Sequence, residues 1–218
     1  MIIDLFPTPV MMVNVKDRLK TEDIEFIQKW AYDSGYVSRQ DKPLDAQEDD
    51  FYFLDRILPD VSLKMLLEEY ANNFLHDIWK ESNNRVVLTT SWINSMPAGR
   101  SIERHMHRNS VLSGVLYIDV DAGHSGFTIH KPIPRHIVGY TTKENKYTQD
   151  EMVIKPGKFD LVIFPSTIEH SVPPHNSETN RISLAFNTFY VGNIHTNDQY
   201  GSFGATTIAK ATITGWVS

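Results

Sequence analysis

The stretch FDLVIFPSTIEHSVPPHNSETNRISLAFNTFY, residues 159–190, contains the clearest fold signal in this chain. It begins with the apolar, β-rich run FDLVIF (159–164) and ends in a second such run, RISLAFNTFY (181–190). Proline, serine, asparagine and histidine fill the segment between them. Short β-rich runs separated by turn-forming residues are typical of antiparallel sheets. The stretch therefore predicts two strands of an antiparallel structure.

The same pattern extends toward the N-terminus as far as residue 86. Four more β-rich runs lie at 86–96, 111–120, 126–130 and 152–157, with turn residues between them. Many short strands with frequent turns predict a sandwich or a barrel. The C-terminal portion of the chain is therefore expected to be an antiparallel sandwich or barrel.

Residues before 86 instead show helical spacing. Ile24, Ile27 and Ala31 recur at steps of three and four, which predicts an amphipathic helix over 21–34. A second helix is expected over 60–80, where apolar residues recur mostly at steps of four. These residues are Val61, Met65, Leu66, Tyr70, Phe74 and Ile78. Helices followed by strands indicate the α+β class, with both helices packed on a sheet.

Length and composition indicate one soluble domain. The chain has 218 residues, of which 41% are hydrophobic and 22% are charged, as in ordinary globular proteins. The expected single domain spans 1–218, with a helical part at 1–85, a β-rich core at 86–195 and a C-terminal arm at 196–218. No apolar stretch approaches the roughly 20 residues of a membrane helix. We therefore expect a cytoplasmic protein with no membrane contact.

Charge and cysteine usage exclude some partners and some metal sites. The formal net charge is -6 at pH 7 and no basic run is present, which argues against nucleic acid as a partner. The chain has no cysteine, so it has no disulfide and no thiolate metal site. A transition metal would have to be bound by His, Asp or Glu. The oligomeric state is not predicted.

Three histidines are candidates for such a site. His105 and His107 stand two residues apart, and residues i and i+2 of an extended chain project from the same face. His170 follows the apolar run 159–164, which could deliver it to the same rim. Two histidines at this spacing are more often ordinary surface groups, so the third one matters. We predict that all three imidazoles converge.

Arg181 suggests an anion in the same cavity. Strand alternation puts Arg181, Ser183, Ala185 and Asn187 on one face of the run that begins at residue 181. An arginine inside a β-barrel needs an anionic partner, because a buried charge must be paired. A bound carboxylate satisfies that need. The competing interpretation is a structural ion pair with an acid such as Glu178.

Five segments in order, SWIN (91–94), HMH (105–107), LSGVLYID (112–119), PGKFDLVIFPSTIEHSV (156–172) and RISLAFN (181–187), resemble one known family. They are similar to 2-oxoglutarate and Fe(II) dependent oxygenases, in the group related to prolyl 4-hydroxylases. The resemblance covers about residues 90–190. It implies a double-stranded β-helix, or jelly roll, that oxidises a small molecule or a peptidyl side chain while 2-oxoglutarate is decarboxylated to succinate.

The resemblance also implies roles for individual residues. His105 and His170 would be Fe(II) ligands, and Arg181 with Ser183 would bind the distal carboxylate of the cosubstrate 2-oxoglutarate. Tyr117 would add a phenol to that pocket, and Asn94 is a further candidate. Arginine suits this role because its planar guanidinium binds a carboxylate through two hydrogen bonds.

One position departs from the family pattern. The usual ligands are two histidines and a carboxylate two residues after the first histidine, whereas this chain has His107 there. A His-x-His form is similar to members of this group, so a metal is still expected. Three neutral imidazoles leave the site one unit more positive than the usual set, which favours anions. Glu103 is the alternative carboxylate, ahead of Asp119 and Glu169.

Two other functions stay open. The first is a cupin-like enzyme with three histidines and no 2-oxoglutarate, although cupins expect a glutamate where this chain has Val111 and Leu112. The second is a jelly-roll binding module without catalysis. The residues that select the substrate are expected on the loops 39–52 and 123–148.

The remaining histidines and several aromatic residues are expected to have ordinary structural roles. Gly114 is expected to mark a bulge or a close backbone approach. Trp92 is taken as a packing residue, together with Tyr70, Phe74 and Trp79. Five histidines are expected to be solvated surface groups: His124, His130, His136, His175 and His195.

Overall fold

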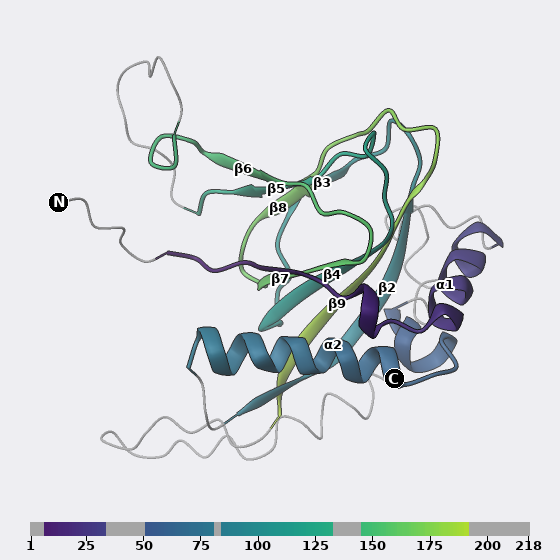
Figure 1. The fold of residues 1–218 in the computed structure, drawn as a ribbon. Helices are drawn as coiled ribbons and strands as arrows, with labels where there is room; N and C mark the ends of the chain where they lie inside the picture. Colours follow the sequence, from purple (N-terminus) through teal and green to yellow (C-terminus); the bar gives the residue numbers. More distant parts are fainter. Residues whose placement is uncertain (1–6, 34–50, 81–83, 133–144, 192–218) are drawn as a thin grey trace, which may run out of the picture.

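The computed structural model describes residues 7–33, 51–80, 84–132 and 145–191. Two antiparallel sheets face each other, and two helices cover the outer side of one of them (Figure 1). The arrangement is a double-stranded β-helix with helices packed on one sheet, as the sequence predicts. The C-terminal arm, residues 39–50 of the first proposed substrate loop and residues 133–144 of the second lie outside the described residues.

The five-stranded sheet has the order β1-β7-β4-β9-β2 and the four-stranded sheet the order β3-β8-β5-β6. The strands of the first sheet are β1 (Met11–Asn14), β7 (Asp160–Pro165), β4 (Leu112–Asp119), β9 (Arg181–Val191) and β2 (Arg85–Met96). Those of the second sheet are β3 (Ile102–His105), β8 (His170–Val172), β5 (Phe127–His130) and β6 (Glu151–Ile154). Strand β1 comes from the part expected to be helical, so that part contributes one sheet edge as well.

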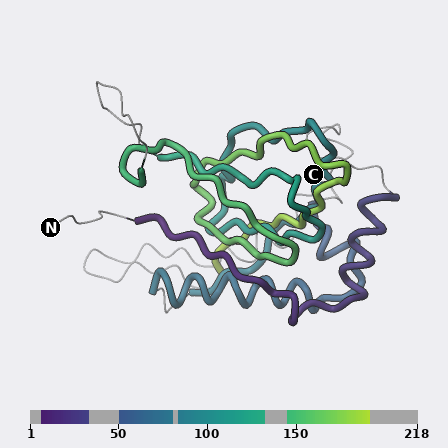
Figure 2. Tube along the Cα trace, turned by 45° about the horizontal axis from the view of Figure 1, so that its top comes forward, coloured from purple at the N-terminus to yellow at the C-terminus, as the bar shows by residue number. Residues whose placement is uncertain are grey.

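Helices α1 (Thr21–Asp33) and α2 (Ser62–Asn73) lie on one flank, away from the four-stranded sheet (Figure 2). Short helical turns precede α1 and α2 at Lys16–Arg18 and Phe53–Ile57, and another follows α2 at Phe74–Ile78. No helix within the described ranges has the length and apolar character that crossing a bilayer requires.

The first helix buries the residues that the sequence predicts, and the second does so only in part. Ile24, Ile27 and Ala31 of α1 are buried. In and around α2, however, Val61 and Met65 are exposed, at 62% and 65%. Steps of four exceed the 3.6 residues of a helical turn, so a stripe drawn at steps of four winds away from the sheet. The buried side is instead formed by Leu63, Leu66, Leu67, Ala71 and Phe74.

Two separate cores result from this layering. The larger core joins the helices to the outer face of the five-stranded sheet, through residues such as Leu67, Leu184 and Phe186. The smaller core lies between the two sheets and includes Phe127 and Phe164. The inner face of the five-stranded sheet is partly polar, and this is where the candidate site lies.

Gly114 is the position where β4 needs the absence of a side chain. A Cβ atom built there would lie 2.1 Å from the ring of Phe186, its partner on β9. The structure therefore confirms a close approach at this glycine, with the Phe186 ring covering the backbone.

Candidate active site

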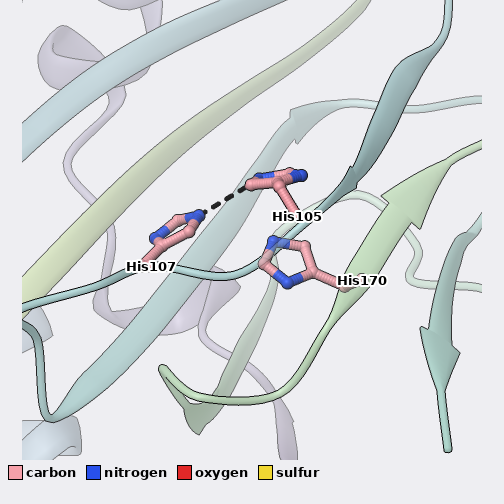
Figure 3. Close-up of side chains that lie close together, drawn as sticks. All are labelled: His105, His107 and His170. Carbon is pink, nitrogen blue, oxygen red and sulfur yellow. Dashed lines mark hydrogen bonds between the residues drawn. The ribbon is translucent and has the colours of Figure 1, made fainter.

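The three predicted histidines converge between the sheets (Figure 3). His105 is the last residue of β3 and lies opposite His170, the first residue of β8. The ring centroids of this pair are 4.3 Å apart, and the His107 centroid lies 5.2 Å from that of His105 and 5.1 Å from that of His170. One nitrogen from each ring falls within 4.8 Å of the others. The arrangement has the dimensions of a metal site.

His105 and His107 do not both belong to strand β3. Strand β3 ends at His105, so His107 lies in the connection to β4 rather than on a continuous strand. Its backbone N–H donates to the carbonyl of Ser166 at 3.0 Å, which fixes the connection against the end of β7. Strand pairing therefore positions His105, and the connection to β4 positions His107.

Hydrogen bonds fix which nitrogen of each ring faces the others. His105 Nδ1 lies 2.7 Å from the backbone oxygen of Glu103, and His170 Nδ1 lies 3.0 Å from that of Ile168. Carbonyl oxygens only accept, so both Nδ1 atoms carry the proton and donate. The Nε2 atoms then present lone pairs to the centre of the cluster, which is the tautomer that binds a metal.

Asn187 orients the third ring in the same way, and sequence reasoning gave it no role. Its Oδ1 lies 2.5 Å from His107 Nδ1 and accepts from the hydroxyl of Ser113 at 2.8 Å, while its Nδ2 donates to Thr90 Oγ1 at 3.2 Å. The Ser113 oxygen is a second partner of His107 Nδ1, at 3.1 Å. His107 Nε2 then lies 3.2 Å from His105 Nε2. Two lone pairs at this distance repel unless a cation lies between them. Alternation along β9 had placed Asn187 on the correct face, and that was the available signal.

His170 is held in an uncharged form by burial, and aromatic rings cover the histidine cluster. His170 is buried, and this desolvation lowers the pKa of the ring to about 3, so that the ring is unprotonated at neutral pH. Phe164 packs edge-on against it at 4.9 Å between centroids. Trp92 lies 5.7 Å from the His107 ring and 6.2 Å from that of Phe51. Trp92 is therefore a packing residue that also borders the cluster.

Arg181 provides the second half of the site. Its side chain is 2% exposed, and burial lowers the pKa of the guanidinium. One nitrogen, Nη1, donates to the Ser125 carbonyl at 3.3 Å, whereas the buried Nε has no hydrogen-bond partner. Within the described ranges Arg181 makes no ion pair, with Glu178 or with any other acid. The structure thus contradicts the structural ion pair and leaves a donor for an anion.

The other residues predicted for the anion pocket share one row across the five-stranded sheet. Ser183 of β9 lies opposite Asn94 of β2 on one side and opposite Tyr117 of β4 on the other, so the three side chains point to the same face. All three are buried. Burial raises the pKa of Tyr117 to about 12, which keeps its hydroxyl protonated, and its ring centroid lies 6.0 Å from the Arg181 guanidinium carbon.

The carboxylates considered as alternative ligands lie elsewhere. Glu103 is exposed and reaches the cluster only through its backbone oxygen. Glu169 pairs with Arg104, and Asp119 pairs with Lys158 at 3.3 Å. No acidic side chain belongs to the histidine group among the residues that the structure describes. His107 is therefore the third member of this group.

Three histidines expected on the surface are buried, which corrects the sequence interpretation. His124, His130 and His175 are 9%, 7% and 4% exposed. His124 Nδ1 accepts from the Asp121 N–H and its Nε2 faces the Thr179 oxygen, both at 2.9 Å. The remaining two, His136 and His195, lie outside the described residues.

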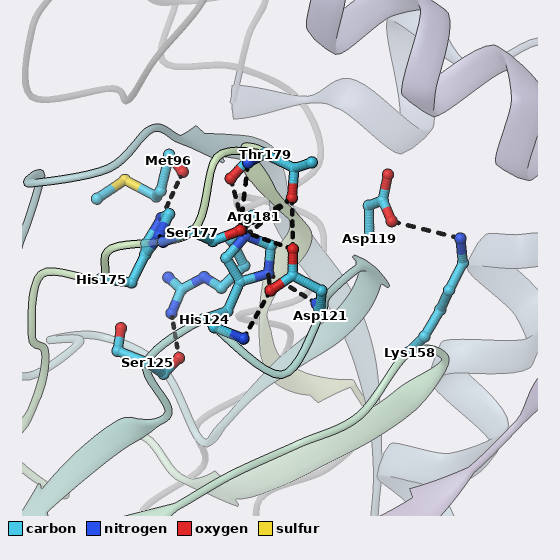
Figure 4. A network of polar contacts seen from close by, with 11 residues as sticks. Met96, Asp119, Asp121, His124, Ser125, Lys158, His175, Ser177, Thr179 and Arg181 are labelled. Carbon is cyan, nitrogen blue, oxygen red and sulfur yellow. Dashed lines mark hydrogen bonds and ion pairs between the residues drawn. The ribbon is translucent and has the colours of Figure 1, made fainter.

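Both ring nitrogens of His175 also have partners (Figure 4). Nδ1 accepts from the Ser177 N–H at 3.2 Å, and Nε2 lies 2.8 Å from the Met96 oxygen. Asp121 ties this network together by accepting from the hydroxyls of Ser177 at 2.6 Å and Thr179 at 2.7 Å. Together these bonds hold the connection that leads into Arg181, and they leave both rings without a free nitrogen for a metal.

The residues present fit a metal together with a dicarboxylate. Three inward-facing lone pairs suit a transition metal bound by imidazole. A buried guanidinium with an unused donor, next to a serine, a phenol and an amide, suits a carboxylate. The charges and donors therefore match Fe(II) and 2-oxoglutarate bound on the inner face of the five-stranded sheet.

Comparison with known proteins agrees with this chemistry. Residues 90–187, which include every predicted site residue, match the family model described as "Putative 2OG-Fe(II) oxygenase". No curated protein sequence matches the chain. A structure described as an oxidoreductase of the 2OG-Fe(II) oxygenase family from Burkholderia pseudomallei is similar, with a TM-score of 0.52 and 13% identity over 82% of this chain and 83% of that one.

EctD from S. alaskensis, in a structure with 2-oxoglutarate and 5-hydroxyectoine, has a TM-score of 0.53 and 12% identity. The match covers 83% of this chain and 72% of that one. At such identities the two structures bear on the fold alone.

Proposed function

We propose that this chain, which belongs to the 2OG-Fe(II) oxygenase family through residues 90–187, binds iron with three histidines and 2-oxoglutarate with a buried arginine. The activity is an oxidation that consumes O2 and 2-oxoglutarate. The carbon–hydrogen bond of a substrate becomes a carbon–hydroxyl bond, and the other products are succinate and CO2. The bound iron supplies the activation of O2.

One observation carries the proposal. All three imidazoles hold their Nδ1 atoms against oxygen acceptors, so three Nε2 lone pairs face one point with no proton between them. An empty arrangement of this kind is electrostatically unfavourable, and a divalent cation makes it favourable. Arg181, which makes no ion pair with any acid in the described ranges, favours a bound carboxylate and hence the cosubstrate.

The side chains have distinct tasks in this proposal. Arg181 grips the distal carboxylate of 2-oxoglutarate, and Ser183 and Tyr117 donate hydroxyl hydrogen bonds to it. Asn94 adds an amide at the same row of the sheet. Asn187 keeps His107 in the tautomer that binds the metal. Phe164 and Trp92 exclude water from the ligand rings.

The family implies a small molecule or a peptide as substrate. We infer in addition a cytoplasmic location and no role for nucleic acid, in agreement with the net charge of -6. The identity of the oxidised compound depends on loops such as 39–52 and 123–148.

The test combines metal content, spectroscopy and product formation. The wild-type protein should bind one Fe(II) or Mn(II) per chain, and anaerobic addition of 2-oxoglutarate to the Fe(II) form should produce a visible charge-transfer band. His170→Ala should lose the metal. Arg181→Met should keep the metal and lose the band at moderate 2-oxoglutarate concentration. Succinate release from pooled metabolites and peptides then identifies the substrate.

Each alternative predicts a different result. If the metal binds with a stoichiometry near one and no band forms at any 2-oxoglutarate concentration, the cupin-like enzyme is correct. If no metal binds, the chain is a binding module. If Arg181→Met binds 2-oxoglutarate as well as the wild type does, the assignment of Arg181 is wrong.

A further inference from the structure

We propose that Ala185 is the specificity-determining residue for the cosubstrate, because its small side chain leaves room for the aliphatic middle of 2-oxoglutarate. A larger side chain at this position excludes the cosubstrate and spares the metal. The inference rests on the proposed function and deepens it by limiting the shape of the dicarboxylate that the site accepts. Ala185 lies near the middle of β9, on the face that also carries Arg181 and Asn187.

Two polar rows cross the inner face of the five-stranded sheet, one at each end of the candidate site. The row beside the histidine cluster consists of Thr90, Asn187 and Ser113. The row beside Arg181 consists of Asn94, Ser183 and Tyr117. The strand register is unbroken from Thr90 to Asn94 in β2 and from Ser113 to Tyr117 in β4. The side chains of both rows therefore point to the same interior.

A single apolar row separates the two polar rows. Ala185 lies opposite Trp92 of β2 on one side and opposite Val115 of β4 on the other, and Val115 lies opposite Val162 of β7. The Trp92 ring is 5.7 Å from the His107 ring, so the apolar row borders the histidine cluster directly. The order polar, apolar, polar complements a molecule with a carboxylate at each end and methylene groups between them. 2-Oxoglutarate is such a molecule.

Ala185 has the smallest side chain of this apolar row. Its methyl group lies between the indole of Trp92 and the isopropyl group of Val115, so the row is lowest at β9. Ala185 is 4% exposed, which means that the interior between the sheets lies above it and bulk solvent does not. Each carbon added at this position therefore takes up interior space between the histidines and Arg181.

The outer face of β9 prevents the backbone from moving outward to make room. Leu184 and Phe186, the sequence neighbours of Ala185, point to the helices and are fully buried in the larger core. The Phe186 ring covers Gly114 so closely that a Cβ atom there would lie 2.1 Å from it. Because this side is already close-packed, a larger residue at position 185 must project inward.

The first experiment measures the two affinities separately. The free-ion EPR signal gives the Kd for Mn(II) without cosubstrate, and calorimetric titration of the Mn(II)-loaded protein gives the Kd for 2-oxoglutarate without turnover. Ala185→Val should keep the Kd for Mn(II) within about twofold of the wild type, because no ligand ring contacts the added carbons in this proposal. It should raise the Kd for 2-oxoglutarate by at least about tenfold.

Ala31→Val is the matched control for overpacking. Ala31 is 3% exposed and belongs to the larger core, on the side of the sheet away from the histidines. The same two carbons added there should lower the Tm of the protein and leave both dissociation constants within about twofold of the wild type. The comparison separates loss of stability from loss of room for the cosubstrate.

The reverse change tests the same limit with a larger ligand. We expect the wild type to bind 4-methyl-2-oxoglutarate at least about tenfold more weakly than 2-oxoglutarate. Ala185→Gly removes the methyl group of the protein and should reduce this preference by at least about threefold. A residue with a merely structural role would not produce this gain, and the variant preserves the test if Ala185→Val does not fold.

The outcomes distinguish this inference from the proposed function. If the wild type binds Mn(II) and 2-oxoglutarate and Ala185→Val binds both within about twofold of it, the role of Ala185 is wrong and the oxygenase assignment stands. An unchanged preference for 2-oxoglutarate in Ala185→Gly also overturns the inference. If the wild type does not bind 2-oxoglutarate at all, the proposed function fails, and the inference fails with it.

Discussion

Arg181 shows at the scale of a single residue how function opposes stability. A guanidinium that is 2% exposed, with one donor unpartnered and no acid to pair with in the described ranges, is costly in the absence of ligand. Proteins keep such groups where a ligand later satisfies them. The cost should therefore be visible in the stability of the protein without 2-oxoglutarate.

Arg181→Met should stabilise the ligand-free protein by roughly 1–4 kcal/mol, because an apolar side chain of similar length avoids burying a charge. For a chain of this size each kcal/mol corresponds to roughly 2–4 °C in Tm. Differential scanning calorimetry without and with 2-oxoglutarate measures both effects. The wild type should gain stability from the cosubstrate and the variant should gain none.

Arg104→Met is the matched control, since Arg104 is half exposed and paired with Glu169. Loss of a surface ion pair should change stability by less than about 1 kcal/mol. A lower Tm for Arg181→Met than for the wild type would show that the guanidinium is structurally satisfied after all.

The lowered pKa of Asp121 predicts that the free energy of unfolding depends on pH. Hydrogen bonds from Ser177 and Thr179 hold the pKa of this carboxyl well below its usual value of 3.8. The folded state therefore prefers the charged form, so the stabilisation is present above pH 4 and is lost as the pH falls below it. Urea midpoints at pH 7 and pH 3 should show Asp121→Asn less stable than the wild type at pH 7, with a smaller difference at pH 3. An equal difference at both values would contradict the assignment.

At the same scale, sequence reasoning identified the residues whose chemistry is distinctive and failed on those with local structural roles. His105, His107, His170 and Arg181 stood out by spacing and by alternation. His124 and His175 seemed to be ordinary loop histidines because their partners are backbone groups. The oxygens of Thr179 and Met96 are distant in sequence, and residue types contain no signal for such bonds.

At the scale of the element, strands β4 and β9 pack closely because position 114 is a glycine. The Phe186 ring occupies the space where a side chain at position 114 would lie. This contact joins the two strands that carry Tyr117 and Ser183, so packing on the outer face fixes the register of the inner face.

Gly114→Ala should therefore destabilise the protein by about 1–3 kcal/mol, as expected for overpacking. Chemical denaturation measures the change. Combining it with Phe186→Leu makes room for the added methyl group, so the double variant should be less destabilised than the sum of its two single variants. Simple additivity would show that the two positions do not compete for space.

The helices show where periodicity is informative and where it is not. In α1 the spacing of three and four picked out the buried face correctly. In α2 the steps of four selected Met65, which is exposed, and the buried face is centred on Leu63 and Leu67. Almost every third or fourth residue of that helix is apolar, so several stripes are compatible with the sequence. Only contact with β2 selects one of them.

At the scale of the whole molecule, the fold and the site depend on different cores. The larger core lies between the helices and the five-stranded sheet, on the side opposite the histidines. The smaller core between the sheets contains Phe164, which packs on His170. The outer core holds the sheet together whether or not a metal is bound.

Removal of the metal with EDTA should consequently leave the protein folded. We expect an unchanged far-UV circular dichroism spectrum at 25 °C and a drop in Tm of roughly 5–10 °C from the metal-loaded form, as ligand linkage predicts for binding well above the Kd. Loss of secondary structure on chelation would show that the metal is required for folding. His170→Ala should match the EDTA-treated wild type and should not respond to EDTA.

The class of the fold was predictable because strand alternation and turn residues are local signals. The pairing order β1-β7-β4-β9-β2 was not, since it depends on which strands meet across loops of different length. The convergence of the histidines has the same origin. Their spacing suggested it, and the His105–His170 register together with the bond from His107 to Ser166 produces it.

Strand β9 holds both ends of the cavity, Arg181 and Asn187, in a single alternating frame. Deleting or inserting one residue between them would turn one end toward the helices while the other stayed inside. The six-residue interval in β9 is therefore constrained during evolution by the site itself. Directed-evolution libraries that shift this interval should yield no active variants.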